Sequence, residues 1–120
     1  MLDLAEAISR YEARAALFPP KAQCSVCGVS NPLVLVVRRR PVVCATCSAR
    51  LRGRSGYELH HLGGRPSPFA PVRMLAATHR LLTFAQDVTW RGVMPPGSLL
   101  AVGLDLAFWQ MTVDLKEEEP

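Results

Sequence analysis

Cys24-Ser25-Val26-Cys27 and Cys44-Ala45-Thr46-Cys47 contain all four cysteines of this 120-residue chain. Sixteen residues separate the two pairs, a spacing typical of four-thiolate zinc sites. The two-residue gap within a pair lets both sulfurs face one ion, and two pairs complete a tetrahedron. A closed four-sulfur site leaves no position for a substrate. The sequence therefore predicts a structural Zn²⁺ held by Cys24, Cys27, Cys44 and Cys47.

Two disulfides are an alternative interpretation of the same cysteines, and a redox-active dithiol is another. Residues 1–20 carry acidic side chains and end in Pro19-Pro20, without the apolar segment of a secretory signal. We therefore expect a cytoplasmic protein, and a reducing cytoplasm favours bound metal over disulfides. A redox dithiol needs only one of the two pairs.

Basic residues gather in the middle of the chain. The net charge is +4, and residues 13–86 include eleven Lys or Arg but one acid, Glu58. This distribution indicates a polyanionic partner, most simply nucleic acid, with a basic solubilising surface as the alternative. The apolar stretch 99–113 is shorter than the ~20 residues of a membrane span and contains Asp105, so we expect no membrane insertion.

The order of the predicted elements indicates a single α+β domain over 1–120. An amphipathic helix is expected over 2–18, followed by a zinc finger over 22–56. The finger combines a turn at the first cysteine pair, a β-hairpin and a short helix that begins at the second pair. This arrangement resembles a treble clef, with a zinc ribbon as the alternative. Residues 57–92 read as a ββα unit.

A last helix is predicted over 98–115, where Ser98 can cap its first turn. Leu100, Leu104 and Phe108 belong to a broad apolar face that needs cover. We expect this face to pack on the N-terminal helix. A second copy of the chain or a partner protein is the alternative.

Arginines dominate the predicted hairpin tip and the segment after the second cysteine pair. The planar guanidinium group pairs well with phosphate oxygens. Solvated surface charge is the alternative interpretation. We predict nucleic-acid contacts from Arg38, Arg39, Arg40, Arg50, Arg52, Arg54, Arg65 and Arg80.

All three histidines lie in the ββα unit. His60 and His61 are adjacent on the predicted strand, so their rings point to opposite faces, and a docked helix can bring His79 beside one of them. Two imidazoles can hold a divalent cation, and a third suits the removal of a proton from water. This pattern predicts a one-metal phosphodiester hydrolase. Three structural histidines are the alternative.

Three segments carry a resemblance to the HNH endonuclease family: 58–65 (ELHHLGGR), 72–74 and 79–83, with Trp90 downstream. The chain over about 22–92 is similar to small bacterial and phage members in which a zinc-binding cysteine block accompanies a His-His strand. The resemblance implies DNA cleavage in the cytoplasm of a bacterial or phage-infected cell.

The resemblance also implies a role for each histidine. His60 and His79 would bind the catalytic cation, which would be Mg²⁺, Mn²⁺ or a second Zn²⁺, and His61 would be the general base. The family's middle asparagine has no counterpart between His61 and His79. Thr83, one helical turn after His79, is a candidate third ligand. The alternative is a catalytically degenerate, zinc-stabilised nucleic-acid-binding or adaptor module.

Overall fold

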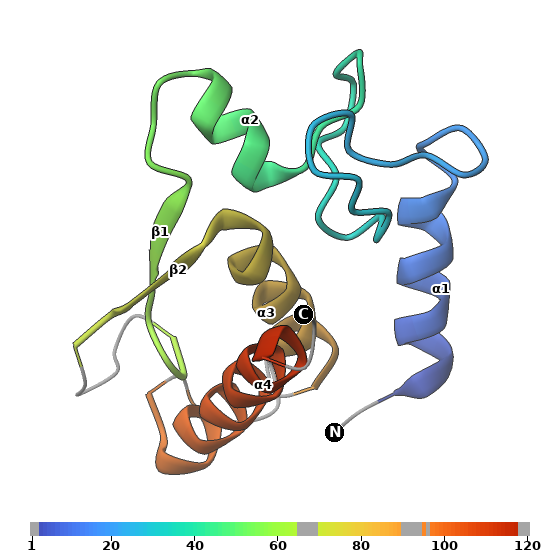
Figure 1. The fold of residues 1–120 in the computed structure, drawn as a ribbon. Helices are drawn as coiled ribbons and strands as arrows, with labels where there is room; N and C mark the ends of the chain where they lie inside the picture. The colour runs from blue at the N-terminus through green and yellow to red at the C-terminus, as the bar shows by residue number, and fades with distance from the viewer. Residues whose placement is uncertain (1–2, 65–69, 90–94, 96, 118–120) are drawn as a thin grey trace.

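The computed structural model describes residues 3–64, 70–89, 95 and 97–117, with the backbone alone for 111–117. The elements, in chain order, are α1 (Leu4–Ala15), α2 (Ala45–Leu51), β1 (Tyr57–His60), β2 (Val72–Leu75), α3 (Ala76–Thr89) and α4 (Leu99–Glu117). Figure 1 shows the sheet beside α3, with α1 on the far side of the molecule. The predicted α+β class is confirmed. No helix among the described residues combines the length and apolar character needed to cross a membrane.

The segment between α1 and α2 is mostly irregular, where the sequence predicted a hairpin. Leu35 and Cys44 form an isolated antiparallel bridge, and the N–H of Val36 donates to the carbonyl of Val43 at 2.9 Å. The ladder extends little further, because Pro41 has no N–H to donate and Arg38 adopts a left-handed φ of 61°. The predicted pairing is therefore present in reduced form.

A small buried core lies under this segment. Val34, Leu35 and Val43 pack with Cys24, Cys44 and Cys47, so the cysteines are core residues as well as candidate ligands. From outside this group, Phe18, Ala77 and Leu81 also contact the core. The finger segment (residues 22–56) is thereby joined to the residues just after α1 and to α3.

The predicted ββα unit is present. β1 pairs antiparallel with β2, with Tyr57 opposite Leu75 and His60 opposite Val72. α3 follows β2 without a linker and packs on both strands. The strand was predicted to include His61, but it ends at His60, since positive φ angles at Gly63 and Gly64 turn the chain.

The N-terminal helix is shorter than the predicted 2–18 and less covered than expected. No residue of α1 is buried, and Leu4 is 64% exposed. Attachment is concentrated at the end of the helix, where the guanidinium of Arg14 donates to the carbonyls of Pro32 (3.2 Å) and Leu35 (2.7 Å). The predicted apolar face of α1 therefore packs only in part.

The expected docking of the last helix on the N-terminal helix is wrong. α4 packs on α3, as Figure 1 shows. The predicted contact face is only partly right. Leu104 and Phe108 are half-buried, but Leu100 is 62% exposed, while Ala101, Val102 and Asp105 are buried. A polar network at Asp105, described below, accounts for this orientation. The predicted cap is confirmed, since the N–H of Ala101 donates to Ser98 Oγ at 3.3 Å.

Candidate metal centre and histidine site

The four cysteines form one cluster. Their sulfurs all lie within 4.8 Å of one another, and Sγ of Cys27 is 3.8 Å from Sγ of Cys44. A tetrahedral zinc with bonds of about 2.3 Å would place its sulfurs about 3.8 Å apart. All four thiols are free, so the alternative of two disulfides does not apply. The cluster fits a metal ion such as zinc.

Backbone amides support the sulfurs. The N–H of Cys27 points to Sγ of Cys24 at 3.5 Å, and the N–H of Cys47 to Sγ of Cys44 at 3.4 Å. Cys44 is also the N-cap of α2. Gly28 adopts a φ of 83°, and its N–H donates to the carbonyl of Cys24 at 2.9 Å. The two N–H to sulfur contacts orient the ligands and stabilise negative charge on sulfur, while the Gly28 bond fixes the turn.

The thiols differ in acidity. Burial raises the pKa of Cys44 and of Cys47. Burial also acts to raise the pKa of Cys24, but hydrogen bonds from the backbone N–H groups of Cys27, Cys44 and Val26 lower it to about 6. Four sulfurs this close do not all ionise together without a cation, so the cluster is suited to hold a divalent metal.

The ββα unit brings two of the three histidines together. His60 lies at the end of β1 and His79 in the first turn of α3. Their ring centroids are 5.1 Å apart, with the ring planes at 70°. These rings come from positions nineteen residues apart in the sequence, so the contact depends on α3 docking on the sheet.

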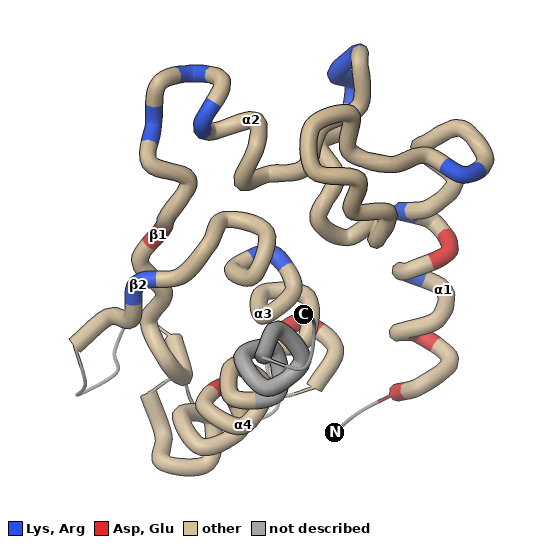
Figure 2. The backbone as a smooth tube through the Cα atoms, viewed as in Figure 1, with Lys and Arg blue, Asp and Glu red and all other residues tan. Residues whose placement is uncertain are grey.

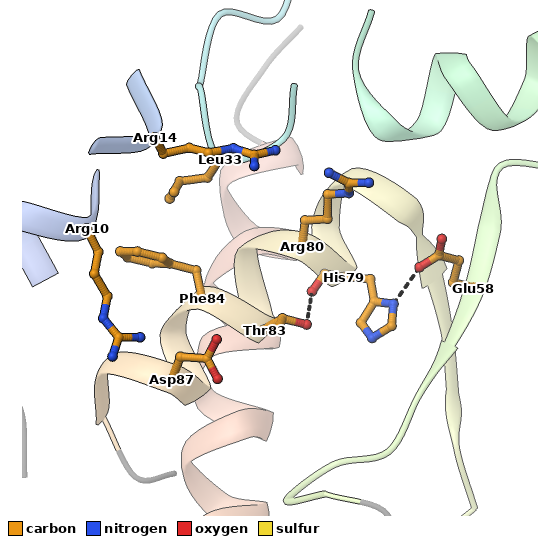
Figure 3. A pocket seen from close by; sticks show the side chains of 9 residues that line it. All are labelled: Arg10, Arg14, Leu33, Glu58, His79, Arg80, Thr83, Phe84 and Asp87. Carbon is orange, nitrogen blue, oxygen red and sulfur yellow. Dashed lines mark hydrogen bonds and ion pairs between the residues drawn. The ribbon is translucent and has the colours of Figure 1, made fainter. Parts of the chain in front are cut away.

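A carboxylate holds each of these two rings. Oε2 of Glu58 lies 2.5 Å from Nδ1 of His79, as Figure 3 shows. Glu58 and His60 are two residues apart on β1, which places them on the same face of the strand. With Nδ1–H donating to Glu58, the lone pair of a neutral His79 lies on Nε2.

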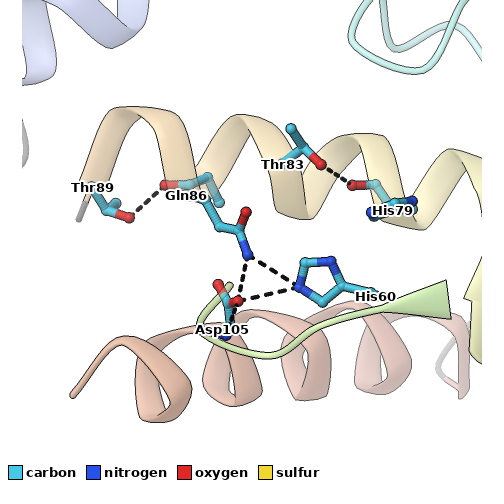
Figure 4. A network of polar contacts seen from close by, with 8 residues as sticks. His60, His79, Thr83, Gln86, Thr89 and Asp105 are labelled. Carbon is cyan, nitrogen blue, oxygen red and sulfur yellow. Dashed lines mark hydrogen bonds and ion pairs between the residues drawn. The ribbon is translucent and has the colours of Figure 1, made fainter. Parts of the chain in front are cut away.

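His60 is held by a buried network from α3 and α4 (Figure 4). Its Nε2 lies 3.2 Å from Oδ2 of Asp105 and 3.2 Å from Nε2 of Gln86. The same Asp105 oxygen accepts hydrogen bonds from the Gln86 amide and, at 2.6 Å, from the N–H of Gly63. The carboxylate therefore favours a proton on Nε2 of His60 and a lone pair on Nδ1.

The remaining predicted site residues are placed differently. His61 is half-buried just beyond β1, and its carbonyl accepts a hydrogen bond from Gly64 at 3.0 Å. Nine described residues line a cleft of about 470 Å³ beside His79, and His61 is not among them. The hydroxyl of Thr83 donates to the carbonyl of His79 at 2.9 Å, back along the helix. The proton of this hydroxyl is therefore taken by the helix backbone.

The predicted arginines surround the finger segment. Figure 2 shows basic residues on the loop before α2 and on the segment after it. Arg39 reaches α2, where its guanidinium donates to Ser48 Oγ at 3.0 Å, and Arg50 donates to the carbonyl of Ser55 at 3.3 Å. Arg38, Arg40, Arg52 and Arg54 are exposed. Arg80 lies on α3 beside His79, and Arg65 falls outside the described residues.

Asp105 was not predicted as a site residue. Its signal was the presence of one acid in an otherwise apolar stretch, because an acid on a buried helix face needs donors. Glu58 could also have been noticed, because it is the one acid within residues 13–86 and lies two residues before His60 on the same strand. The donors for Asp105 come from α3 and from the turn after β1, and sequence spacing does not reveal that meeting.

Within the described residues, the cysteines are the group of three or more metal-binding side chains whose ligand atoms lie within 4.8 Å of one another. A cation at the histidine pair would therefore have two imidazole ligands from this chain in the observed arrangement. Comparison of the chain with protein-family models, with curated proteins and with solved structures finds no match.

Proposed function

We propose that this protein is a metal-dependent endonuclease of the HNH type, which hydrolyses DNA phosphodiester bonds on a zinc-stabilised scaffold. The observation that carries this proposal is the contact between the rings of His60 and His79 across the ββα unit. The proposal assigns the cysteine cluster to structural zinc, in a finger of treble-clef type. Turn, reduced hairpin and helix follow one another there in the order that such a finger requires.

The protonation pattern of the two rings supports a cation site. Asp105 and Glu58 each take the N–H of one ring, so Nδ1 of His60 and Nε2 of His79 are the nitrogens suited to bind metal. Carboxylates that orient ligating histidines in this way are common around metal sites. A divalent cation bound there, such as Mg²⁺, Mn²⁺ or a second Zn²⁺, would neutralise charge on the phosphate.

In the proposed reaction His61 is the general base. Its imidazole would take a proton from water while the water oxygen attacks phosphorus and the P–O bond to the leaving oxygen breaks. The exposed arginines of the finger segment would bind the flanking phosphates, in accordance with the basic middle of the chain. We assign the protein to the cytoplasm, since four free clustered thiols suit a reducing compartment.

A second function is favoured by the buried network itself. Asp105 and Gln86 surround Nε2 of His60, and the middle asparagine of the HNH pattern is missing. A catalytically degenerate module that binds nucleic acid through its arginines would keep such a network for stability. It would bind DNA in a salt-sensitive way without requiring a divalent cation.

Plasmid nicking in Mg²⁺ or Mn²⁺ separates the two functions. We expect wild type to nick, and His61→Ala and His79→Ala to lose nicking. Leu59→Ala is the matched control, because Leu59 lies on β1 between the site residues and is 60% exposed. Equal nicking by wild type and His61→Ala contradicts the catalytic assignment. DNA binding without nicking in either cation favours the second function.

A further inference from the structure

A cleft between α1 and α3 has His79 in its lining. Its volume is about 470 Å³, within the range of small-ligand sites and too small to enclose a nucleic-acid duplex. Three of its nine lining residues are arginines: Arg10 and Arg14 from α1, and Arg80 from α3. His79 and Glu58 line the end away from Arg10, as Figure 3 shows. A ligand in the cleft would therefore reach His79.

The guanidinium groups of Arg14 and Arg80 face each other across this cleft (Figure 3). Arg14 is fixed by the carbonyls of Pro32 and Leu35, which use its Nε and Nη2. Among the described residues, its Nη1 donors therefore remain for another acceptor. Burial and the neighbouring charge of Arg80 lower the pKa of Arg14. Two neighbouring cations are stabilised when an anion lies between them.

The acids of the cleft are placed away from this pair. Glu58 is bonded to His79, and Asp87 lies at the other end, towards Arg10. Arg10 is itself paired with Glu6 at 2.7 Å. The region between Arg14 and Arg80 is thus the positive part of the cleft, and Phe84 supplies an aromatic surface nearby.

We propose that Arg14 and Arg80 bind one phosphate of a single nucleic-acid strand, which lies in the cleft with a base against Phe84. Paired guanidinium forks suit phosphate oxygens, and aromatic side chains stack on bases of any sequence. This inference rests on the proposed nucleic-acid substrate and adds that the strand enters unpaired. It also gives α1 a function, because this helix contributes Arg14 to the site.

Fluorescence anisotropy with a labelled short oligothymidylate, without added Mg²⁺ or Mn²⁺, tests the inference. We expect Arg80→Gln to weaken binding about tenfold and to lower the salt slope by about one. Arg73→Gln is the matched control, since Arg73 is exposed on β2 and stacks over Tyr57 at 4.3 Å. We expect the control to change binding less than about twofold, as for a residue outside the cleft.

A second variant addresses α1. Arg14→Lys keeps one charge and can still donate to the carbonyls that fix the helix, but it loses the planar fork. We expect it to weaken binding while circular dichroism stays unchanged. Equal binding by Arg80→Gln and Arg73→Gln overturns the inference. So does a duplex that binds as tightly as the single strand with the same dependence on Arg80.

The result of the binding test can be distinguished from the result of the nicking test. A wild type that binds the strand through Arg80 but never nicks contradicts the hydrolase and leaves the cleft assignment standing. A wild type that nicks, while Arg80→Gln binds the strand normally, contradicts the cleft assignment alone.

Discussion

Oδ2 of Asp105 lies 3.2 Å from Nε2 of His60, and both side chains are almost completely buried. The carboxylate comes from α4 and the imidazole from β1, so the contact ties the last helix to the ββα unit. Gly63 and Gln86 donate to the same carboxylate oxygen. Burying an ionised carboxylate is costly unless donors surround it, and three groups among the described residues, His60, Gly63 and Gln86, do so here. The network therefore fixes both the position of α4 and the orientation of His60.

Replacing Asp105 tests this role. We expect Asp105→Ala to lower the free energy of unfolding by about 3–5 kcal/mol, because it leaves buried donors without an acceptor. Asp105→Asn keeps one oxygen acceptor and should cost less, about 1–2 kcal/mol. Urea denaturation followed by circular dichroism measures both changes.

Glu12→Gln is the control for loss of one negative charge, since Glu12 is exposed on α1. We expect it to change stability by less than about 0.5 kcal/mol. If Asp105→Ala were as stable as this control, the network would not be what holds α4.

Loss of the cluster metal should unfold the finger segment. The cysteines are part of the small core between α1 and α2, so a ligand removed there also disturbs packing. We expect Cys44→Ser to lose bound zinc and to lower Tm by more than about 10 °C. Elemental analysis and thermal denaturation measure the two effects. Ser25→Ala, an exposed change inside the first cysteine pair, should keep one zinc per chain and the wild-type Tm.

Zinc affinity should depend on pH in a particular way. Protons and zinc compete for the same sulfurs, so affinity falls as pH falls. Burial raises the pKa of Cys44 and Cys47, so zinc must displace their protons even at neutral pH. Backbone N–H groups overcome the effect of burial on Cys24 and lower its pKa to about 6. Its proton therefore joins the competition only below about pH 6.

We thus expect affinity to decrease from neutrality and to decrease more steeply below about pH 6, with one further proton competing. Competition with a chromophoric chelator at several pH values measures the slope. A slope that stays constant through pH 6 would contradict the acidity assigned to Cys24.

The sequence allowed the cysteine cluster and the ββα unit to be predicted, because both depend on short-range signals. The two-residue gaps fix the sulfur pairs, and the alternation of β1 places His60 towards α3. The orientation of α4 was not predictable in the same way. Its apolar residues are distributed around the helix, so hydrophobicity alone did not identify the docked face. The docked face is the one that contains Asp105, because its carboxylate accepts hydrogen bonds from Gly63 and Gln86, which lie far away in the sequence.

Glu58 was missed for a related reason. The distribution of charge marked it as the one acid of the basic middle, but its partner depends on how α3 docks on the sheet. The finger arginines were recognised by composition, whereas Arg14, within the amphipathic helix predicted over 2–18, was not among the predicted site residues. Its contact with the carbonyl of Leu35 is a tertiary feature that helical periodicity does not reveal.

The pair formed by Glu58 and His79 should matter for activity more than for stability. Glu58 is exposed on β1, and exposed ion pairs contribute about 1 kcal/mol or less. We expect Glu58→Gln to change the free energy of unfolding by no more than that, while nicking falls because His79 loses its fixed orientation. Stability and nicking measured on the same preparation separate the two effects. A loss of nicking matched by unfolding would mean that Glu58 is structural.

Gly63, in the turn after β1, should tolerate substitution poorly. Its φ is 75°, and a Cβ there would lie 2.6 Å from Cγ2 and 2.8 Å from the backbone nitrogen of Val102 on α4. Gly53 offers a matched control, with a φ of 79° and nothing within 4 Å of an added Cβ. In both alanine variants a side chain must adopt the left-handed backbone conformation, which costs about 1–2 kcal/mol. Gly63→Ala alone must also push α4 away from the turn.

That displacement would pull the Gly63 N–H and the Asp105 carboxylate apart, so the steric and polar losses add. We expect Gly53→Ala to cost about 1–2 kcal/mol and Gly63→Ala to cost about 2 kcal/mol more, from the clash and the lost hydrogen bond. Urea denaturation measures the difference, and hydrogen exchange at α4 amides locates it. Equal costs for the two variants would show that α4 is not packed against this turn, and the buried network with His60 would then lose its basis.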